Sequence, residues 1–323
     1  MNIAMLSGWH VHATGYANEF NAQEGVKVTA VWDEIPERGQ KWAADLGATF
    51  YEDVDALLAD ESIDAVACSS PTNLHGDLLV RAAKAGKHIF TEKVLALTNE
   101  EAYAIRDAVR ENGVRFTISF PHQTNPAIAT AKKLCEQGVL GTLTYGRMRN
   151  VHSGSIRDWL PPHFYDATQC GGGAMIDLGA HPMYLLADFL GKPTRISSAF
   201  TNVTDRPVED NAVSLLEFEG GAIGVSETGF VSLCDPFTLE ISGTAGCLRV
   251  VGHELTVTTA QGSKTYSKDE MSVDFLSPIS YFVQSVRDGK DGKHYGIDEA
   301  VRLTEIMVAA YAAAKTAAKA DLR

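Results

Sequence analysis

The stretch Asn2-Ile3-Ala4-Met5-Leu6-Ser7-Gly8-Trp9-His10-Val11-His12-Ala13 joins a short apolar run to a glycine and then to a segment with helical spacing. We expect a buried strand over 2–7 and a helix over 13–23. The same alternation predicts strands at 26–32, 65–69, 88–91 and 115–119, and helices at 37–46, 74–85 and 100–111. Strands that alternate with helices through short connections form a parallel sheet covered on both faces. Residues 1–120 are therefore predicted to form a doubly wound α/β domain that binds ligands at the carboxyl ends of its strands.

The pattern changes after residue 120. A helix is expected at 127–137 and a strand at 143–151, followed by a loop rich in glycine, proline and histidine that reaches Gly171. Short strands then follow closely on one another, at 195–202, 211–218, 222–228, 237–242, 247–251 and 254–259. Helices return only at the end, including the alanine-rich 299–319. This order predicts an α+β domain over 121–323 with a mostly antiparallel sheet.

Composition limits the class of partner. The 323 residues carry a net charge of −13, which repels phosphate backbones, so we expect no nucleic acid partner. No apolar run approaches the roughly 20 residues that cross a bilayer, and the first residues lack a basic segment and a cleavage site. Neither a membrane nor a signal peptide is therefore expected. The five cysteines are scattered and form no Cys-x-x-Cys pair, which indicates a reduced, cytoplasmic protein without a disulfide framework or zinc site.

The turn after the first strand holds only one glycine of the Gly-x-Gly-x-x-Gly pattern that cradles a dinucleotide pyrophosphate. Gly8 is present, but Trp9 stands where the backbone would approach the phosphate. A helix N-terminus still offers amide N–H groups to an anion. Taken alone, the turn slightly favours an ordinary strand-to-helix connection over a nucleotide site.

Asp33 ends the second expected strand, 25 residues after Gly8, near the spacing at which an acid binds the ribose 2′-hydroxyl of NAD. Glu34 adds negative charge and the next basic residue is Arg38, so the 2′-phosphate of NADP would be repelled. We therefore expect NAD as cofactor in preference to NADP. An Asp33 that only starts a turn, or caps the helix beginning near Pro36, is an equal alternative.

His10 and His12 flank Val11 in the first turn, and one of them is expected to contact a ligand phosphate or ribose. A His-x-His metal site would need a third ligand, and none with suitable spacing is evident, so we expect no metal. After the strand at 88–91, a Lys93 ammonium near a nicotinamide ring would polarise a substrate hydroxyl or carbonyl. A solvated lysine paired with Glu92 is the commoner fate of such a dipeptide.

Asp177 and His181 sit four residues apart in Gly171-Gly172-Gly173-Ala174-Met175-Ile176-Asp177-Leu178-Gly179-Ala180-His181. A glycine run before an apolar stretch indicates a backbone that turns tightly or lies close to a neighbouring group. If Gly173 opens a helix, the two side chains stack on one face, where the carboxylate can fix the imidazole tautomer and favour its protonated form. We interpret Asp177 and His181 as a proton-transfer pair.

Three stretches together closely resemble the Gfo/Idh/MocA family of NAD(P)-dependent sugar and polyol oxidoreductases. They are Ser69-Ser70-Pro71-Thr72-Asn73-Leu74-His75, Ala82-Ala83-Lys84-Ala85-Gly86-Lys87-His88-Ile89-Phe90-Thr91-Glu92-Lys93, and the motif at 171–181. The resemblance covers essentially the whole chain. It implies an N-terminal Rossmann domain and a C-terminal α/β domain with an open, mostly antiparallel sheet. It also implies that the exposed face of that sheet forms a subunit interface, so we expect a homodimer or homotetramer.

Carried over by position, Lys93 matches the family lysine that reaches both nicotinamide and substrate, His181 the catalytic histidine, and Asp177 the acid one helical turn before it. The residues expected to bind the cofactor are Gly8, Trp9, His10, His12, Asp33, Ser70, Pro71, Thr72, His75, Glu92 and Lys93. The chain departs from the family pattern in its degenerate glycine motif and in Thr72, which replaces the common asparagine. Val94 also replaces the proline after Lys93, a residue that fixes φ and can favour a cis bond.

The loop Ser153-Gly154-Ser155-Ile156-Arg157-Asp158-Trp159-Leu160-Pro161-Pro162-His163-Phe164-Tyr165 resembles the substrate-side segment of some family members. Arg157 and Trp159 offer a hydrogen-bond fork and a flat apolar face, a combination suited to a sugar ring. His122 falls where the chain enters the second domain and is expected to line the substrate site. Packing or surface roles for these three residues are an equal alternative.

These residues lead to one hypothesis and two alternatives. We expect reversible oxidation of a secondary hydroxyl on a sugar, polyol or derivative, in which His181 takes the proton, Asp177 orients the imidazole and Lys93 stabilises the developing alkoxide. One alternative is a glycosidase that uses tightly held NAD for transient oxidation. The other is a non-catalytic regulator that binds nucleotide or sugar. Retention of the three catalytic residues favours an enzyme, because a pure binder needs no proton-transfer set.

Overall fold

The computed structural model describes residues 1–234, 237–271, 276–290 and 294–316. The chain divides into two compact units. The first unit comprises Met1–Phe120 and Leu276–Thr304, and the second comprises Pro121–Phe275 and Glu305–Arg323. A late segment thus belongs with the first 120 residues, so a single division of the chain after residue 120 does not describe the two units.

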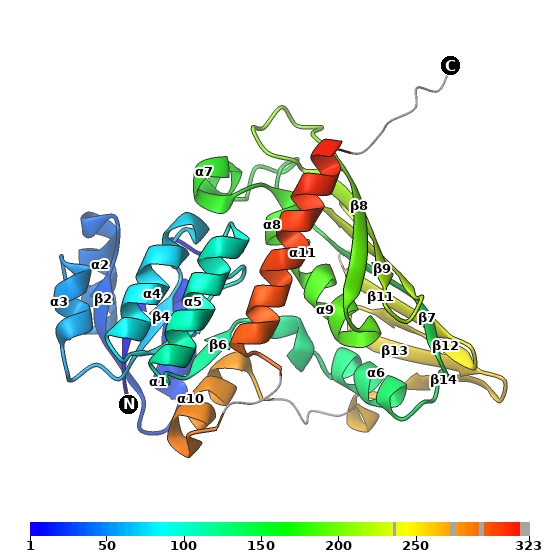
Figure 1. Cartoon of the computed structure of the whole chain (residues 1–323), viewed down its shortest axis with the longest axis horizontal. Coiled ribbons are helices and arrows are strands. Elements are labelled where there is room, and N and C mark those ends of the chain that lie inside the picture. The colour runs from blue at the N-terminus through cyan, green and yellow to red at the C-terminus, as the bar shows by residue number, and fades with distance from the viewer. Residues whose placement is uncertain (235–236, 272–275, 291–293, 317–323) are drawn as a thin grey trace. The chain divides into compact units, whose positions relative to one another are not determined.

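Six parallel strands form the sheet of the first unit, in the order β3-β2-β1-β4-β5-β6 (Figure 1). Their bounds are β1 Asn2–Leu6, β2 Lys27–Trp32, β3 Thr49–Phe50, β4 Ala65–Cys68, β5 His88–Thr91 and β6 Phe116–Ile118. The predicted doubly wound parallel sheet is confirmed. Strand β3 and helix α3 (Val54–Ala59) are not predicted from the sequence, because two and six residues are too few to show a hydrophobic period.

Helices cover both faces of this sheet, with α4 and α5 in front of it in Figure 1. Their bounds are α1 Ala13–Ala22, α2 Pro36–Leu46, α4 His75–Lys84, α5 Asn99–Glu111 and α10 Pro278–Asp288. The buried rings of Phe20 in α1, Phe90 in β5 and Phe282 in α10 meet edge to face, with centroids 5.5 to 6.0 Å apart. Truncating one such ring costs about 3–5 kcal/mol. These contacts explain why the late helix α10 belongs to the first unit.

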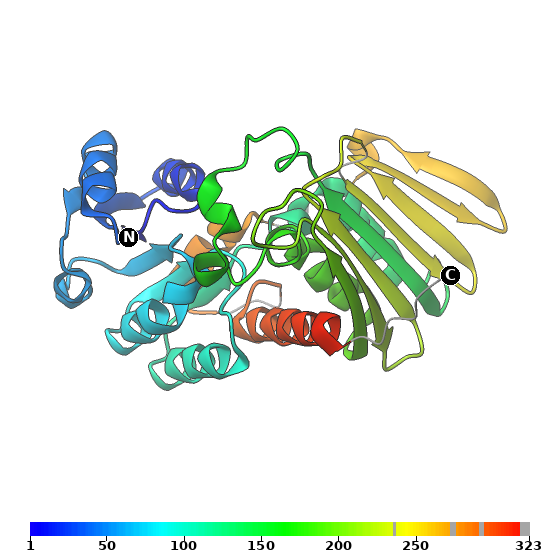
Figure 2. The same ribbon diagram turned by 90° about the horizontal axis from the view of Figure 1, so that it is seen from above.

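Eight strands form the sheet of the second unit, in the order β14-β13-β12-β11-β7-β10-β9-β8. Their bounds are β7 Leu143–Val151, β8 Pro193–Thr201, β9 Asn211–Phe218, β10 Ile223–Gly229, β11 Phe237–Gly243, β12 Gly246–Val251, β13 Glu254–Thr259 and β14 Gly262–Tyr266. Within this second sheet, over the described residues, only the β7–β10 pair is parallel, so the predicted mostly antiparallel sheet is confirmed. Figure 2 shows these strands as one curved layer, coloured from green to gold.

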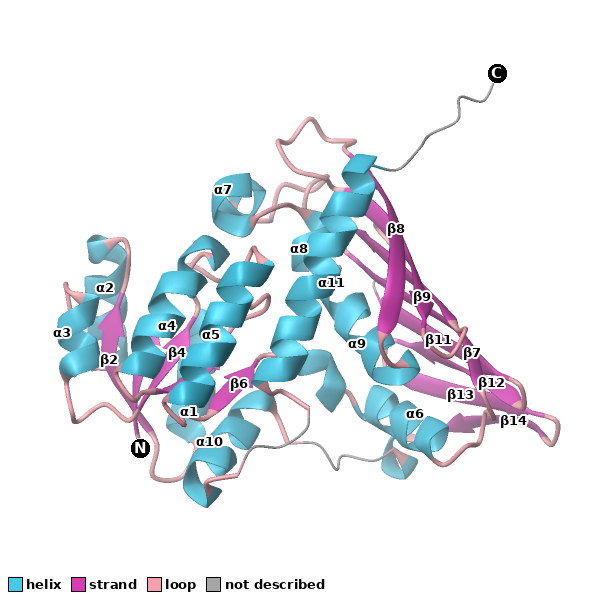
Figure 3. Cartoon of the chain, in the orientation of Figure 1, coloured by secondary structure: helices cyan, strands magenta, loops and turns pink. Residues whose placement is uncertain are grey.

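One face of the second sheet is packed against helices, as Figure 3 shows for α6 (Pro126–Glu136), α8 (Ala174–Asp177) and α9 (Ala180–Leu190). A β-carbon added at Gly146 of β7 would lie 2.9 Å from Leu186 of α9, so glycine allows that helix to lie close to the strand. Side chains of β9 alternate strictly between exposed and buried, which leaves the opposite face of the sheet open. The last helix, α11 (Ile297–Thr316), matches the predicted helix at 299–319 except for its last three residues, which lie outside the described ranges. Over the described residues, no helix is both long and apolar enough to span a bilayer.

Candidate active site

Four strands of the first sheet end in register. The pairs are Leu6 with Trp32, Leu6 with Cys68, and Cys68 with Thr91. The chain leaves these strands at Ser7, Asp33, Ser69 and Glu92, so all four segments begin at the same edge of the sheet. Sheets of this class hold their ligands at this edge. The candidate site of the first unit is therefore built from the segments that follow β1, β2, β4 and β5.

The turn after β1 is shaped by Ser7 and Gly8. Ser7 has a φ of 72°, a left-handed conformation that is uncommon for a residue with a side chain. Its hydroxyl oxygen accepts a hydrogen bond of 3.0 Å from the Trp9 N–H. A β-carbon added at Gly8 would lie 3.3 Å from the Trp42 ring and 3.5 Å from an Asp33 carboxylate oxygen. The single glycine of the degenerate motif thus lets the backbone pass close to the end of β2.

Asp33 is buried at the end of β2, and its carboxylate is engaged on both oxygens. Oδ2 accepts from the Gly8 N–H at 2.8 Å, and Oδ1 accepts from the Ile35 N–H at 2.8 Å. Arg38 adds a hydrogen bond from Nε to Oδ2 at 2.9 Å and one from Nη2 to Oδ1 at 2.7 Å. A carboxylate offers about four lone-pair sites, so in this arrangement the protein itself occupies them.

Glu92 is the centre of a hydrogen-bonded cluster after β5. Its Oε1 lies 2.6 Å from His12 Nδ1 and accepts from the Tyr16 hydroxyl at 2.5 Å, and its Oε2 accepts from the Lys93 N–H at 2.6 Å. Burial alone would raise the pKa of Glu92, but the charge of His10 and the hydrogen bond from His12 hold that pKa well below its ordinary value. The buried side chain is therefore a carboxylate that fixes the backbone at Lys93.

Tyr16 belongs to this cluster, although the sequence analysis does not single it out. Its hydroxyl lies 2.8 Å from Ser119 Oγ as well as near Glu92, and burial together with that carboxylate raises the pKa of Tyr16 well above its ordinary value. Tyr16 lies four residues after His12, so the i, i+4 rule places both side chains on one face of α1. Applying the i, i+4 rule to His12 would therefore have predicted Tyr16 as its neighbour.

His10, His12 and Glu92 each bring one possible metal-ligand atom, and these atoms lie within 4.8 Å of one another. The sequence analysis found no third ligand because Glu92 lies 80 residues from His12. The 2.6 Å between His12 Nδ1 and Glu92 Oε1 is a hydrogen-bond distance, whereas two ligands of one tetrahedral zinc ion lie roughly 3.3 Å apart. We therefore assign the cluster as a hydrogen-bonded network.

His75 fixes the backbone on the other side of Lys93, whose peptide bond to Val94 is cis. Its Nδ1 lies 3.1 Å from both Val94 O and Leu95 O, and its Nε2 lies 3.1 Å from Ser70 O. Carbonyl oxygens only accept hydrogen bonds, so these contacts favour an imidazole that carries hydrogen on both nitrogens. Burial alone would lower the pKa of His75, but the charge of the neighbouring Cys68 thiol, followed by hydrogen bonds to Cys68 and to the backbone, raises that pKa. From the sequence, His75 is expected to bind the cofactor, whereas in the structure both of its ring nitrogens contact backbone carbonyls of the protein.

The loop after β4 supplies the other expected cofactor residues. Ser70, Pro71 and Thr72 are all buried, and the Ser70 hydroxyl lies 3.2 Å from Cys68 Sγ. Ser69 Oγ is buried and has no hydrogen-bond partner among the described residues. An unpaired buried hydroxyl at the carboxyl edge of the sheet is a group that a polar ligand would satisfy.

In the second unit, His181 lies near the start of α9 and is buried. Its Nδ1 lies 3.2 Å from the Tyr184 hydroxyl, which also accepts a 3.2 Å hydrogen bond from the His122 N–H. The His122 ring meets the His181 ring at 4.5 Å and 86° and stacks on Phe237 at 4.7 Å. The structure thus brings His122 and His181 together through Tyr184. Tyr184 is missed in the sequence analysis, although its i+3 spacing from His181 predicts a shared helix face.

The predicted continuous helix from Gly173 through His181 is not formed. Asp177 ends the short helix α8, and α9 begins at Ala180. Leu178 and Gly179 keep right-handed helical dihedral angles between them, but the Gly179 N–H reaches back five residues to Ala174 O. Asp177 is half-buried, and its N–H donates to Gly173 O at 3.1 Å. Asp177 and His181 therefore lie on two consecutive short helices instead of on one continuous helix.

The glycine run before α8 lies close to other parts of the second unit, as its composition predicts. A β-carbon at Gly172 would lie 1.9 Å from the Tyr311 hydroxyl, and one at Gly173 would lie 2.1 Å from Glu209 O. Glu209 Oε1 accepts hydrogen bonds from the Gly173 N–H and the Met175 N–H at 3.0 Å and from Tyr311 at 2.6 Å. Glu209 and Tyr311 therefore hold the segment that leads to Asp177.

The expected substrate residues of the loop are exposed. Trp159 is 52% exposed, and its ring is tilted by 56° against the His152 ring, with centroids 4.6 Å apart. The His152 ring in turn stacks on Phe230 at 4.8 Å. Arg157 is exposed as well, and its N–H donates to Ser153 O at 3.0 Å. The loop thus presents an exposed indole beside the stacked rings of His152 and Phe230.

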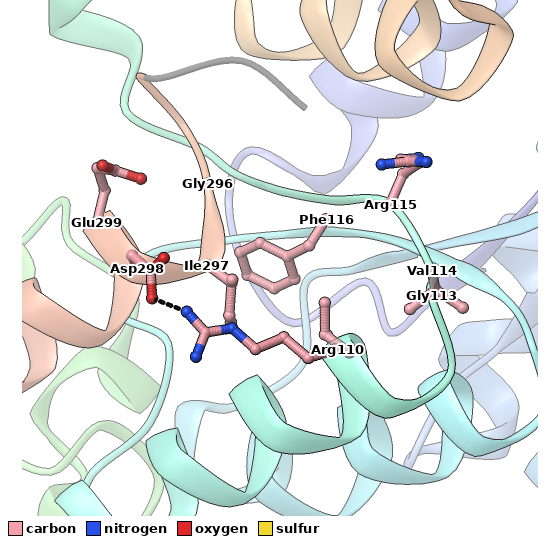
Figure 4. Close-up of a pocket in the computed structure, with 10 residues that line it drawn as sticks. Arg110, Gly113, Val114, Arg115, Phe116, Gly296, Ile297, Asp298 and Glu299 are labelled. Atoms are coloured by element: carbon pink, nitrogen blue, oxygen red, sulfur yellow. Dashed lines mark hydrogen bonds and ion pairs between the residues drawn. The ribbon is translucent and has the colours of Figure 1, made fainter. Parts of the chain in front are cut away.

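A cavity of about 490 Å³ lies at the opposite end of the first sheet. Figure 4 shows Arg110 of α5 reaching Asp298 at 2.6 Å, with Phe116 at the start of β6. The lining residues are Val109, Arg110, Gly113, Val114, Arg115, Phe116, Gly296, Ile297, Asp298 and Glu299. Because β6 begins here, the cavity belongs to the amino ends of the strands and is separate from the edge that carries Lys93.

A parallel doubly wound sheet with a ligand edge, followed by a unit built on a mostly antiparallel sheet, is an architecture typical of dinucleotide-dependent oxidoreductases. The chain belongs to the Gfo/Idh/MocA family. Residues 6–120 match the oxidoreductase family with an NAD-binding Rossmann fold, and residues 128–249 match the GFO/IDH/MocA C-terminal domain. The predicted family membership is confirmed.

Named relatives fall in the same family. The chain is 30% identical over 302 residues to scyllo-inositol 2-dehydrogenase (NAD(+)) of Bacillus subtilis, covering 88% of this chain and 86% of the relative. It is 26% identical to D-xylose 1-dehydrogenase (NADP(+)) 2 of Haloferax volcanii over 88% of this chain and 89% of that one. The fold matches that of levoglucosan dehydrogenase in complex with NADH and levoglucosan, with a TM-score of 0.87, 21% identity, and coverage of 98% and 97% of the two chains.

The residues at the carboxyl edge fit the NAD that this family binds. Gly8 allows close approach of the backbone, Ser69 Oγ offers an unused polar atom, and α1 begins after His12 without a side-chain cap. Uncapped first-turn amides of a helix attract a phosphate group. Gly8, Ser69 and the start of α1 would hold the cofactor, which supplies a hydride acceptor at the nicotinamide ring when bound.

Proposed function

We propose that this oxidoreductase oxidises a secondary hydroxyl of a sugar, polyol or close derivative, or reduces the matching carbonyl, with NAD(H). The observation that carries the proposal is the placement of Lys93 at the ligand edge of an NAD-binding sheet. Glu92 fixes the backbone on one side of Lys93, and His75 fixes it on the other. The dehydrogenase relatives described above act on an inositol and on a xylose, which supports a polyhydroxylated substrate.

Lys93 is assigned to the charge that develops on the substrate oxygen. A fixed cation near an alkoxide lowers the cost of deprotonating the hydroxyl, and it polarises a carbonyl in the reverse direction. The side chain is buried, which limits the screening of its charge by water. The hydrogen bond from the Lys93 N–H to Glu92 fixes the backbone from which the side chain extends.

His181 is assigned as the base that takes the hydroxyl proton. The Tyr184 hydroxyl lies 3.2 Å from Nδ1, and we assign the imidazole proton to that contact. This tautomer leaves the Nε2 lone pair for the substrate. Asp177 supplies negative charge one turn earlier in the chain and stabilises the imidazolium that forms.

The exposed indole of Trp159 is assigned to the substrate ring. An apolar ring face of a sugar packs on a flat aromatic surface, while Arg157 offers donors to its hydroxyls. Trp159 contacts the His152 ring, which stacks on Phe230, and these contacts support the indole without a substrate present. His122, whose ring touches that of His181, is assigned to the same substrate.

The open face of the second sheet is assigned as the subunit interface of a homodimer or homotetramer. Register places Val213, Leu215, Ile223 and Val251 on that face, and each is 40 to 43% exposed. The same face carries the ion pairs of Arg147 with Glu227 at 2.7 Å and with Glu240 at 3.6 Å. Apolar side chains bordered by paired charges are suited to a self-complementary interface.

The working compartment is proposed to be the cytoplasm. The five cysteines are free thiols, which favours a reducing environment.

The proposal is tested by NADH formation with a panel of inositols, alditols and aldoses, with NADP in parallel. We expect turnover with at least one polyhydroxylated substrate. His181→Ala should lower kcat by about 10²–10⁴-fold while leaving NADH affinity unchanged. His253→Ala, which removes an exposed histidine of the same unit, is the matched control. Tight NADH binding without turnover on any member of the panel would favour the regulator, and release of free sugar without net NADH would favour the glycosidase.

A double-mutant cycle tests whether Lys93 and His181 serve one reaction. If both act on the same bond-breaking step, the losses from Lys93→Ala and His181→Ala should be strongly non-additive. Lys84→Ala removes an exposed lysine at the end of α4 and controls for the loss of charge. Additive losses would mean that the two side chains do not act as one unit.

A further inference from the structure

The connection from β8 to β9, residues 202–210, packs on the loop that carries Trp159. Val208 of this connection shares a buried hydrophobic cluster with Leu160 and Tyr165 of the loop. These three side chains are only 5 to 7% exposed, whereas Trp159 itself is exposed. The loop therefore has a packed base, and the residue expected to meet the substrate ring stands out from it.

Arg206 reaches from the same connection onto the loop at three points. Its guanidinium carbon lies 4.0 Å from the centre of the Tyr165 ring. Nη2 donates to Ser155 O at 3.4 Å and pairs with the carboxylate of Asp158, the residue directly before Trp159. Nε is buried and has no hydrogen-bond partner among the described residues, so Nη2 and the ring contact make the attachment.

The turn that presents Arg206 is itself held by hydrogen bonds. The buried Asp210 carboxylate accepts from the Val203 N–H at 2.9 Å, and from the N–H and the hydroxyl of Thr204 at 2.8 and 2.6 Å. Asn202 Nδ2 donates to Arg206 O. Because these bonds tie the turn to the end of β8 and the start of β9, Arg206 gives the loop a fixed anchor.

Exposure decides which contact of Arg206 contributes most. The Asp158 side chain is 80% exposed, and an ion pair so open to water adds little stability. Tyr165 is buried, and a guanidinium that is 26% exposed over such a ring is partly desolvated, which strengthens the cation–π attraction. The contact with Tyr165 is thus the main attachment. The Asp158 pair holds a residue whose φ of 50° is uncommon for a side-chain-bearing residue.

We propose that Arg206 is the positioning residue of the substrate loop, and that it holds residues 153–165 so that Trp159 is in place before a sugar or polyol binds. The inference rests on the proposed function, in which Trp159 contacts the substrate ring. A loop that is ordered in only some molecules lowers the apparent affinity by that fraction. Loss of Arg206 should therefore raise KM and leave the step assigned to Lys93 and His181 unchanged.

The expected size follows from the ordered fraction of the loop. A cation–π contact together with one hydrogen bond from a charged group shifts an equilibrium by about 30-fold. If the wild-type loop is open in about one molecule in fifteen, the loop of Arg206→Ala is open in about two molecules in three. The open population then rises about 10-fold, while KM rises about 3-fold.

Limited proteolysis measures this opening without any substrate. Chymotrypsin accepts aromatic residues, and a cut after Trp159 gives the fragments 1–159 and 160–323, which mass spectrometry identifies. The rate of the cut follows the population of the open loop. It should rise about 10-fold in Arg206→Ala. Arg206→Lys should fall between that variant and the wild type, because lysine keeps the charge but not the planar group.

Kinetics with a substrate from the panel above then separates positioning from a general loss of structure. Arg206→Ala should raise KM about 3-fold with kcat and the Kd for NADH unchanged, the pattern of a lost binding contribution. Arg195→Ala is the matched control, since it removes an exposed arginine of the same unit that pairs with Glu217 at 3.4 Å. The control should change neither KM nor the rate of the cut.

Cleavage of Arg206→Ala at the wild-type rate would overturn the proposal, because the loop would be held without the guanidinium. Faster cleavage with an unchanged KM would overturn it as well, since the order of the loop would not serve the substrate. If Arg206→Ala is unfolded in a urea titration, Arg206→Lys carries the same comparison. If no sugar or polyol is oxidised, the proposed function fails, and the proteolysis still decides whether Arg206 holds the loop.

Discussion

Replacing Tyr184 by phenylalanine tests how His181 is held. The change removes one oxygen and keeps the buried ring, so no large cavity forms. That oxygen serves two contacts, to His181 Nδ1 and from the His122 N–H, each 3.2 Å long. A hydrogen bond is worth a net 0.5–1.5 kcal/mol, so the free energy of unfolding should fall by about 1–3 kcal/mol.

Tyr184→Phe should lower kcat more than a variant that only loses stability would. Without the hydroxyl, the His181 ring loses the contact that sets its tautomer, and the Nε2 lone pair is available in only part of the population. If the activation free energy rises by about 1.4 kcal/mol because the imidazole is less well positioned, kcat falls tenfold. The affinity for NADH should stay constant, because Tyr184 is assigned to the base and not to the cofactor.

The assay combines urea unfolding, steady-state kinetics and a pH profile of kcat. Tyr295→Phe is the matched control, since it also removes a tyrosine hydroxyl with a 3.2 Å hydrogen bond, to Leu276 O in the first unit. The control should lose stability and keep kcat. A folded Tyr184→Phe enzyme with wild-type kcat and pH profile would refute the assignment of Tyr184 as the positioning residue for His181.

Three further predictions follow from single contacts. Gly172→Ala should destabilise the second unit by about 1–3 kcal/mol through overpacking, since its β-carbon would meet the Tyr311 hydroxyl at 1.9 Å, and Gly220→Ala, with no atom within 4 Å, should be neutral in the same urea melt. The pKa of Glu92 is held below its ordinary 4.5, so its ionised form stabilises the fold above that pH and the contribution is lost as the pH falls toward the folded-state pKa. Glu92→Gln should therefore lower the free energy of unfolding most at neutral pH, and an equal loss at all pH values would contradict the carboxylate assignment. Leu215→Glu, on the open face of the second sheet, should shift the protein toward monomer in light scattering, and an unchanged mass would remove that face from the interface.

Much of the fold follows from local pattern. The bounds of β5, β7, β9 and β13 agree with the strands expected at 88–91, 143–151, 211–218 and 254–259. Alternation along a strand and helical spacing depend only on neighbouring residues, so they can be found in the sequence. Where the pattern is short or interrupted, it fails. Strand β3 has only two residues, and the helix expected through His181 is divided into α8, which ends at Asp177, and α9, which begins at Ala180.

The chemistry at the strand ends was only partly visible in the sequence. Lys93 and His181 stand in motifs whose order and spacing identify the family, so their positions can be found in the sequence. The residues that contact them in the fold cannot be found in that way. Tyr16, His12 and Glu92 meet although the last of them is 80 residues from His12, and no local period relates them. Tyr184 could have been predicted as a neighbour of His181, since its i+3 spacing places both on one helix face. Only the structure shows that its hydroxyl also contacts His122.

The sequence by itself determined the two kinds of sheet, the family and the residue types available for catalysis, because each of these depends on local periodicity or on motifs of fixed spacing. Only the tertiary structure decided which polar groups are already satisfied. Asp33 is an acid after a strand in the sequence, and in the fold it is an acid covered by Arg38. His75 lies in a loop motif, and in the fold both of its nitrogens face backbone carbonyls. The physical reason is that hydrogen bonds and ion pairs form between groups that packing brings within about 3 Å, and sequence separation does not encode that distance.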